Sequence, residues 1–259
     1  MDQLETPSTE TVVKGAPIYD DEFYEDQIAG SYKSAVQFVQ YLSMIINPKT
    51  VADAGCGRGT WLKAFKEHGA TRCVGFDGPW NSQSKMLDQG IDFVCTDLNE
   101  SLSKYGETFD LALSLEVAEH LEATSAVHFI KGLTSLSKVI IFGAAYSGQG
   151  GTEHINEQPH TYWAKLLGNC GYRPYDLFRP KFWGNEQIEP WYQQNTFLYV
   201  HESSDVNAVL MKLGHRPIEN LAFMNCIHPW LYGVKLKQLA HQTKFRRIVK
   251  SFIPAKFLR

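Results

Sequence analysis

The amino-acid sequence predicts an α/β fold in which helices cover both faces of a mostly parallel sheet. Short apolar runs alternate with segments whose apolar residues recur every three or four positions, which is the pattern of repeated strand and helix. A glycine-rich loop joins the first of these strands to the helix after it. An aspartate stands at or just after the end of each of the next two strands, where open α/β sheets bind ligands.

The expected elements follow the chain in order. Residues 34–46 show helical spacing of apolar side chains and stop at Asn47 and Pro48, residues that end helices. Strands are expected at the apolar runs 50–54, 73–76, 93–95, 109–115, 139–142 and 196–201. Helices are expected at 61–69, 82–89, 124–136 and 162–168. A long loop, 144–160, follows the strand at 139–142, and such loops hold substrate sites in open α/β sheets.

The length of 259 residues suits one principal domain with a full core. We expect a flexible tail over 1–17, a main domain over 18–203 and a helical extension over 204–259. The net charge of −3 gives no reason to expect a nucleic acid as partner. The charge is uneven, because 235–259 holds eight Lys or Arg and no Asp or Glu, which leaves −11 (−3 minus 8) on the other 234 residues.

The cysteines and the N-terminus indicate a compartment. The cysteines are odd in number and form no C-x-x-C pair, and their mostly apolar surroundings predict reduced, buried thiols at Cys56, Cys73, Cys95, Cys170 and Cys226. The first residues lack the basic and apolar regions of a signal peptide, and no run of about 18 apolar residues occurs. These features predict a soluble cytoplasmic protein.

The central motif is VADAGCGRGT at 51–60, a strand that runs into glycines and then into a helix. Glycines let the backbone turn tightly and approach a ligand, and the N–H groups at a helix start attract a carboxylate or phosphate. The spacing is G-x-G-x-G, and Thr60 stands where the dinucleotide fingerprint G-x-G-x-x-G has its third glycine. The motif therefore argues against NAD.

Two aspartates complete a possible adenosyl site. Asp77, twenty residues after Gly57, ends the next strand and is placed to accept hydrogen bonds from a ribose diol. Asp97, one strand later, is placed to bond the exocyclic amine of adenine, with Leu98 against the ring. Each acid alone could merely cap a turn, since Asp is a common turn residue. Together with the glycine loop, they outline a site for an adenosyl group attached to an amino acid.

The motifs VADAGCGRG, VGFDG, CTDLNE and SLEVAEHLE resemble those of class I S-adenosylmethionine-dependent methyltransferases, nearest to the ubiquinone-biosynthesis-type group. The resemblance extends over about 19–203 and implies a Rossmann-like seven-stranded sheet whose antiparallel last strand is 196–201. It implies that the methionine end of the cofactor lies against the loop residues Asp53, Gly55, Cys56, Gly57 and Gly59. Asp77 would then bind the ribose and Asp97 with Leu98 the adenine, while Glu116 would close the pocket.

Methyl transfer to a hydroxyl needs a base that removes the hydroxyl proton. His154, in the segment GGTEHINE of the long loop, is the candidate, because this loop leaves the sheet at the same edge as the glycine motif. In the alternative interpretation, His154 and Asn156 only brace the loop by hydrogen bonds.

Glu116, Glu119 and His120 form a second group, since i, i+3 and i+4 spacing on a helical turn brings three side chains to one face. Glu119 and His120 are therefore also candidates at the reacting centre. The run resembles the metal-ligand run of small-RNA 3′-terminal methyltransferases, which implies His154 as a fourth ligand and Mg²⁺ or Mn²⁺ as the ion. Metal-free relatives also carry an E-x-x-E-H run, in which the acids cap a helix and line the cofactor.

Aromatic and amide residues precede the last expected strand, namely Trp183, Trp191, Tyr192, Gln193, Gln194 and Asn195. Aromatic rings beside amides suit the apolar face and hydroxyl edge of a sugar, or a flat ring. A run of hydrogen-bonding side chains is unusual in a buried element, so we expect 191–195 to form a wall of the acceptor pocket. Core packing would explain the aromatic residues equally well.

The basic end of the chain has apolar residues repeating at three and four, among them Leu236, Leu239, Ile248 and Phe252. This spacing predicts a basic amphipathic helix. It could lie on an anionic membrane surface, which would place the protein peripherally at the inner face of a membrane. The favoured alternative is that its apolar stripe docks on the main domain and leaves the charges in water.

The leading hypothesis is an O-methyltransferase that acts on a hydroxyl of a small molecule or glycan precursor, with His154 as base. A metal-dependent methyltransferase acting on an RNA 3′ end is the first alternative, and the acidic main domain argues against it. A catalytically silent adenosyl-binding adaptor is the second, and formation of any methylated product would exclude it.

Overall fold

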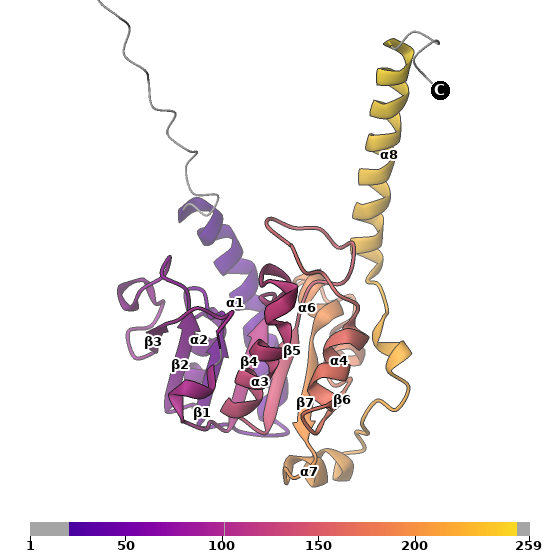
Figure 1. Ribbon diagram of the computed structural model, residues 1–259. Helices are drawn as coiled ribbons and strands as arrows, with labels where there is room; N and C mark the ends of the chain where they lie inside the picture. Colours follow the sequence, from indigo (N-terminus) through magenta and orange to yellow (C-terminus); the bar gives the residue numbers. More distant parts are fainter. Residues whose placement is uncertain (1–20, 101, 253–259) are drawn as a thin grey trace, which may run out of the picture.

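The computed structural model describes residues 21–100 and 102–252, so the expected flexible tail at 1–17 lies outside the described residues. Seven strands form one sheet in the order β3-β2-β1-β4-β5-β7-β6 (Figure 1). The strands are β1 (Thr50–Ala54), β2 (Arg72–Asp77), β3 (Asp92–Cys95), β4 (Leu111–Leu115), β5 (Val139–Gly143), β6 (Tyr172–Tyr175) and β7 (Phe197–His201). Only β7 runs antiparallel to its neighbours, which confirms the expected Rossmann-like sheet with an antiparallel last strand.

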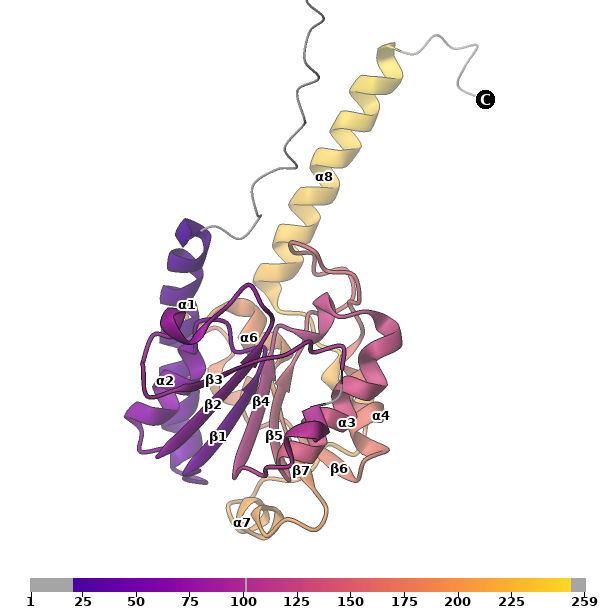
Figure 2. The same cartoon turned by 60° about the vertical axis from the view of Figure 1, so that its left-hand side comes forward.

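Helices cover both faces of the sheet (Figures 1 and 2). One apolar cluster joins the sheet to α1 (Asp21–Ser43), α2 (Thr60–Glu67), α5 (Arg179–Phe182) and α6 (Pro190–Asn195). The other cluster joins it to α3 (Ala126–Leu136) and α4 (His160–Gly168). The short 3-10 turns are η1 (Gln83–Lys85), η2 (Leu102–Tyr105), η3 (Ala118–His120), η4 (Ala123–Ser125) and η5 (Leu221–Met224). The central strands β4 and β5 are apolar along most of their length because both of their faces are buried.

Several elements differ from the sequence expectation, among them α1, which begins 13 residues (34 minus 21) before the expected helix at 34–46, and the short helix α5, which was not expected. The segment 82–89 contains only the 3-10 turn η1 where a short helix was expected. Strand β6 was not anticipated, because Pro174 has no N–H to donate to a neighbouring strand and a proline therefore argues against a strand. The structure places β6 at the edge of the sheet, where a proline is tolerated. The helix α6 was not anticipated either, since its six residues are too few to show a helical period.

The cysteines are all free, yet not all are buried. Cys56 and Cys73 lie in the core as expected, whereas Cys95 and Cys226 are exposed and Cys170 is half-buried. The prediction of buried thiols is therefore wrong for these three positions. Cys95 is the last residue of β3, and β3 is exposed because it forms the outer edge of the sheet.

Beyond β7 the described chain continues as α7 (Val206–Lys212), η5 and α8 (Pro229–Phe252). Figures 1 and 2 show α8 rising away from the sheet at the edge where the parallel strands end, while α7 lies at the opposite edge. Leu236 and Leu239 are 47% and 49% exposed, so the expected docking of α8 on the main domain is wrong for the described side chains. In the part of the chain that the structure describes, no helix is long and apolar enough to cross a membrane.

Candidate active site

The glycine loop lies at the point where the strand order reverses, between β1 and its neighbours β2 and β4. Open α/β sheets bind ligands at this point. The backbone φ angles of Gly55, Gly57 and Gly59 are 89°, 51° and 79°, values that residues other than glycine rarely adopt. A Cβ added at Gly57 would meet nothing within 4 Å, so the space above the loop is open to a ligand.

Asp77 connects the end of β2 to the glycine loop. Its Oδ2 accepts a hydrogen bond of 2.7 Å from the backbone N–H of Gly57, and its Oδ1 accepts one of 2.7 Å from Gly78. Burial raises the pKa of Asp77, and hydrogen bonds from these two amides and from the side chains of Trp80 and Asn81 oppose that rise. A carboxylate has about four acceptor sites, so a ribose hydroxyl that binds Asp77 would take the place of the Trp80 or Asn81 side chain.

The remaining residues expected at the cofactor lie at the same edge of the sheet. Asp53 is buried beneath the loop, and burial with the nearby charge of Asp77 raises its pKa. The Cys56 thiol is buried and points to the Gly57 carbonyl at 3.5 Å. Leu98 is buried beside the β3 end, whereas Asp97 is exposed and accepts bonds of 2.9 and 3.0 Å from the backbone and side chain of Asn99. Asp97 thus caps a turn in this structure, as the alternative interpretation expects.

The segment after β4 differs from the expected helical turn. Glu116 has φ of 56°, in the left-handed region, and precedes the 3-10 turn η3. Its side chain accepts a bond of 2.9 Å from Asn195 and one of 3.3 Å from Gln149. Glu116 thus lies outside η3, yet its carboxyl group still lies next to that of Glu119, and the two groups affect each other's pKa.

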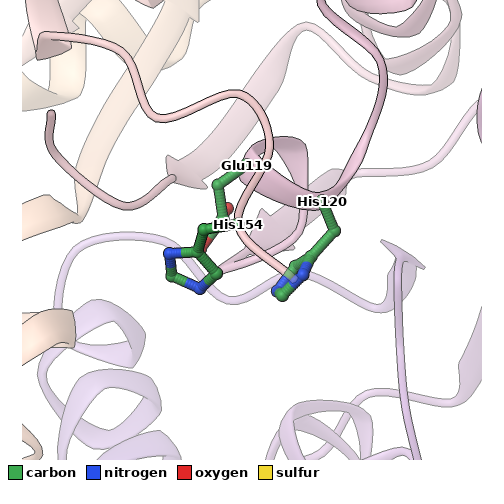
Figure 3. A group of neighbouring side chains, drawn as sticks. All are labelled: Glu119, His120 and His154. Atoms are coloured by element: carbon green, nitrogen blue, oxygen red, sulfur yellow. The ribbon is translucent and has the colours of Figure 1, made fainter. Parts of the chain in front are cut away.

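Glu119, His120 and His154 come together across 34 positions of sequence (Figure 3). Each offers a ligand atom, and these atoms lie within 4.8 Å of one another. The two imidazole rings meet edge to face, with centroids 4.8 Å apart. The backbone N–H groups of Ile155 and Asn156 both donate to the Glu119 carbonyl at 2.9 Å, so the loop is pinned to η3.

Glu119 is the unusual member of this cluster. Its side chain is fully buried, and its carboxylate makes no well-formed hydrogen bond among the described residues, although the backbone amides of Glu119 and Ala145 lie near enough to act on its pKa. Burial and the charge of Glu116 hold the pKa of Glu119 well above its ordinary value. Burial and the charge of His154 lower the pKa of His120, which favours neutral imidazole. A buried carboxyl without a partner is costly unless it binds a proton or a cation.

His154 is oriented by an acidic partner that the sequence interpretation missed. Its Nδ1 lies 3.0 Å from Oε1 of Glu157, which leaves Nε2 as the available basic nitrogen. Glu157 also accepts bonds of 2.7 and 2.6 Å from the N–H groups of Gly148 and Gly150. Burial alone would raise the pKa of Glu157, but the bond from His154 and the two amide bonds outweigh it and lower that pKa. The three-residue spacing from His154 to Glu157 was the signal for this pair.

The amides before β7 are buried rather than open to an acceptor. Gln193 bonds the backbone at Gly184, Asn185 and Ile188, and Gln194 bonds Gln149 and the N–H of His228. Tyr192 is also buried, Trp191 is half-buried, and Trp183 is exposed and stacks on His228. The expected pocket wall at 191–195 is instead an interior network. Its function in the fold is to hold Glu116 through Asn195.

His160 lies at the end of this hydrogen-bond network, and the sequence interpretation did not predict a function for it. Its Nδ1 lies 2.8 Å from the Met224 carbonyl and its Nε2 3.0 Å from Oδ1 of Asn195. Burial lowers the pKa of His160 to about 4, against the opposing effect of these two bonds. His160 is therefore neutral at physiological pH.

Replacing His160 with glutamine is expected to make the fold less sensitive to acid. Between pH 6.5 and about 4 the unfolded chain binds a proton that folded His160 does not bind, so the free energy of unfolding falls as the pH falls. The effect is absent above pH 6.5 and reaches roughly 3 kcal/mol at the acid end. Urea unfolding at about pH 7.5 and about pH 4.5 measures it. If the free energy of unfolding fell equally in wild type and variant between these pH values, the assignment to His160 would be wrong. The control is His128→Gln at an exposed position, which should lose as much as wild type.

One hollow of about 630 Å³ lies elsewhere, at the amino edge of the sheet beside Pro48, Asp110 and Lys138. None of the expected site residues lines it. Asp110 there accepts bonds from the N–H groups of Lys49 and Thr50, which is a structural role.

Residues 24–136 match the family model described as a methyltransferase domain. No curated protein sequence matches the chain. Among solved structures, the methyltransferase domain of bacterial CtHen1-C is 19% identical with a TM-score of 0.52, over 66% of this chain and 98% of that one. An O-methyltransferase family protein from Burkholderia thailandensis is 15% identical with a TM-score of 0.53, over 71% of this chain and 60% of that one.

A further similar structure is magnesium protoporphyrin IX methyltransferase from Synechocystis PCC 6803 with bound SAH, which is 19% identical with a TM-score of 0.51 over 73% of this chain and 90% of that one. At these identities the structural likeness shows the shared fold.

Proposed function

We propose that this chain, which carries a class I S-adenosylmethionine-dependent methyltransferase domain, transfers the methyl group to a hydroxyl of a small molecule or glycan precursor. The observation that carries the acceptor chemistry is the His154–Glu157 pair, held at 3.0 Å in a loop over the carboxyl edge of the sheet. The loop is pinned to η3, and η3 adjoins the glycine loop because Gly55 lies directly against Val117.

The residues of the cofactor region fit an adenosyl amino acid. The glycine loop leaves open space above Gly57, and Asp77 presents a carboxylate at the end of the neighbouring strand. Under the proposal, Asp77 accepts the ribose hydroxyls and the glycine loop lies against the methionine end of the cofactor. When bound, S-adenosylmethionine supplies an electrophilic methyl group on sulfur.

His154 acts as the general base. Its Nε2 accepts the hydroxyl proton as the acceptor oxygen forms its bond to the methyl carbon and the carbon–sulfur bond breaks. The products are a methyl ether, S-adenosylhomocysteine and a proton on His154, which passes to water. Glu157 holds the Nδ1 proton and stabilises the imidazolium that forms.

The test begins with isothermal calorimetry of S-adenosylmethionine and S-adenosylhomocysteine on metal-stripped protein. Binding of both without metal is expected. The protein is then incubated with panels of hydroxylated small molecules and glycan precursors, and methylated products are sought by mass spectrometry. Absence of cofactor binding would overturn the proposal, and methylation confined to amines would overturn its oxygen specificity. Any methylated product excludes a silent adaptor.

A divalent ion at Glu119, His120 and His154 is the second candidate, because one oxygen of the buried Glu119 carboxylate and one nitrogen of each imidazole lie within 4.8 Å of one another. The donor set fits Mn²⁺ better than Mg²⁺, since imidazole is a poor Mg²⁺ ligand. Such an ion would bind vicinal hydroxyls, as at an RNA 3′ end, and would lower the pKa of the one that is methylated. The charge of −11 outside the basic end disfavours RNA as acceptor.

Glu119→Gln separates the two candidates. If an ion binds there, the variant is expected to lower Mn²⁺ affinity at least about tenfold, because a neutral amide replaces the only carboxylate of the cluster. Titration of Mn²⁺ followed by electron paramagnetic resonance measures this affinity. Exposed Glu122→Gln, two residues on, is the matched control. Wild-type protein that binds no Mn²⁺ would exclude the metal-dependent candidate and leave His154 as the base.

A further inference from the structure

Large apolar side chains stand exposed where the chain leaves the main domain. Phe223 in η5 is 69% exposed, and Trp230, Tyr232 and Leu236 in α8 are 54%, 57% and 47% exposed. Tyr232 and Leu236 are four residues apart and so lie on one side of the helix. Leu239, three residues further on and 49% exposed, extends them into an apolar strip along one side of α8, and such strips mark interaction surfaces.

Positive charge accompanies this apolar surface. Lys235 and Lys237 stand among the exposed apolar residues, and the sequence from 220 to 259 contains eight Lys or Arg and no Asp or Glu. The rest of the chain is acidic. The combination of Trp, Tyr and Leu with Lys is the one that binds the interface of an anionic membrane.

The base of α8 is tied firmly to the active-site edge. The N–H of His228 donates to Oε1 of Gln194 at 2.7 Å, and the Trp183 ring packs against the His228 ring with centroids 4.8 Å apart and a tilt of 54°. Gln194 bonds Gln149 in the network that holds Glu116. Figures 1 and 2 show α8 leaving from the same edge of the sheet as the 144–160 loop. A surface bound by α8 would therefore lie on the active-site side of the domain.

We propose that α8 and the exposed apolar residues at its base bind an anionic lipid surface and hold the carboxyl edge of the sheet next to it. Pairing of α8 with a second copy is disfavoured, because it would bring like charges together and α8 has no acidic residue to pair with them. Nucleic acid is disfavoured because a phosphate backbone makes no use of exposed Phe, Trp and Leu together.

The experiment is co-sedimentation of the whole protein with vesicles of phosphatidylcholine alone or of phosphatidylcholine with phosphatidylglycerol. Binding is expected only to the anionic vesicles and should weaken as salt is raised. Lys235→Gln with Lys237→Gln is expected to weaken binding at least tenfold, since each basic residue near the surface contributes about a fivefold factor. Trp230→Ser with Leu236→Ser is expected to weaken it at least as much.

Matched controls use exposed residues of other helices. Lys131→Gln with Lys165→Gln removes two charges from α3 and α4, and Val127→Ser removes an exposed apolar side chain from α3. All variants should keep wild-type affinity for S-adenosylhomocysteine, which shows that they are folded. The proposal is overturned if anionic vesicles do not bind the protein or if the α8 variants bind like the controls. Self-association or RNA binding that depends on α8, without vesicle binding, would overturn it as well.

Discussion

Asp77→Asn is expected to weaken S-adenosylmethionine binding by about 100-fold or more. The carboxylate would accept charge-assisted bonds from two ribose hydroxyls, each worth roughly 1.5–3 kcal/mol, and the neutral amide cannot replace both. The substitution also weakens the 2.7 Å bond that holds the Gly57 amide, so the loop itself loses order. Isothermal calorimetry on the purified variant gives the change in affinity.

The control for this substitution is Asp92→Asn, an exposed aspartate at the opposite end of the adjacent strand β3. It should bind S-adenosylmethionine like wild type. If Asp77→Asn bound the cofactor within about threefold of wild type, the ribose would have to lie elsewhere, since the loss of even one charge-assisted bond exceeds that factor. A smaller effect is expected for Asp97→Asn, because the exposed Asp97 carboxylate already bonds Asn99.

His154→Gln is expected to lower kcat by about 10²–10⁴-fold, the usual contribution of a general base. Cofactor affinity should stay unchanged, because His154 lies in the loop and not in the glycine motif. Activity lost in the variant should return in part as the pH is raised, since hydroxide then replaces the base. The rate is measured as S-adenosylhomocysteine formed with the hydroxyl acceptor identified by product screening.

Two further measurements separate the functions of this histidine. Exposed His128→Gln should leave the rate unchanged. Glu157→Gln should reduce kcat less than His154→Gln and shift the pH profile, because Glu157 positions the imidazole and does not touch the acceptor. If a chelator abolished wild-type activity as completely as His154→Gln does, His154 would act as a metal ligand and the base assignment would fail.

Much of the sheet could be predicted from local sequence. The run at 50–54 coincides with β1, because a strand buried on both faces is a continuous apolar run that ends sharply at glycine. Strand β6 could not be predicted, since Pro174 is acceptable only at a sheet edge and the edge is known only once all seven strands are placed. The same holds for Gln193, Gln194 and Asn195, whose burial depends on distant partners such as Gln149 and His228.

The candidate site divides in the same way. The glycine loop and Asp77 are local features, separated by one helix and one strand, and parallel strands necessarily bring their carboxyl ends together. Glu119, His120 and His154 could be nominated by residue type, but their contact depends on two backbone bonds from the loop to the Glu119 carbonyl. Glu116 also lies beside Glu119, but through a residue at positive φ and a bond from Asn195 and not through a regular helical turn, and neither feature has a local signature.

Local sequence was enough to predict the fold class, the order of most strands and helices, and the glycine loop at 51–60, because apolar periodicity and glycine conformations act over a few residues. Only the tertiary structure decided which polar groups meet and where the basic helix points. The amphipathic pattern of α8 is equally compatible with a helix that docks on the main domain and with one that projects from it. The position of His228, held by Gln194 and Trp183, directs α8 away from the sheet in this fold. Such long-range contacts have no local signature, because they depend on the packing of elements far apart in the chain.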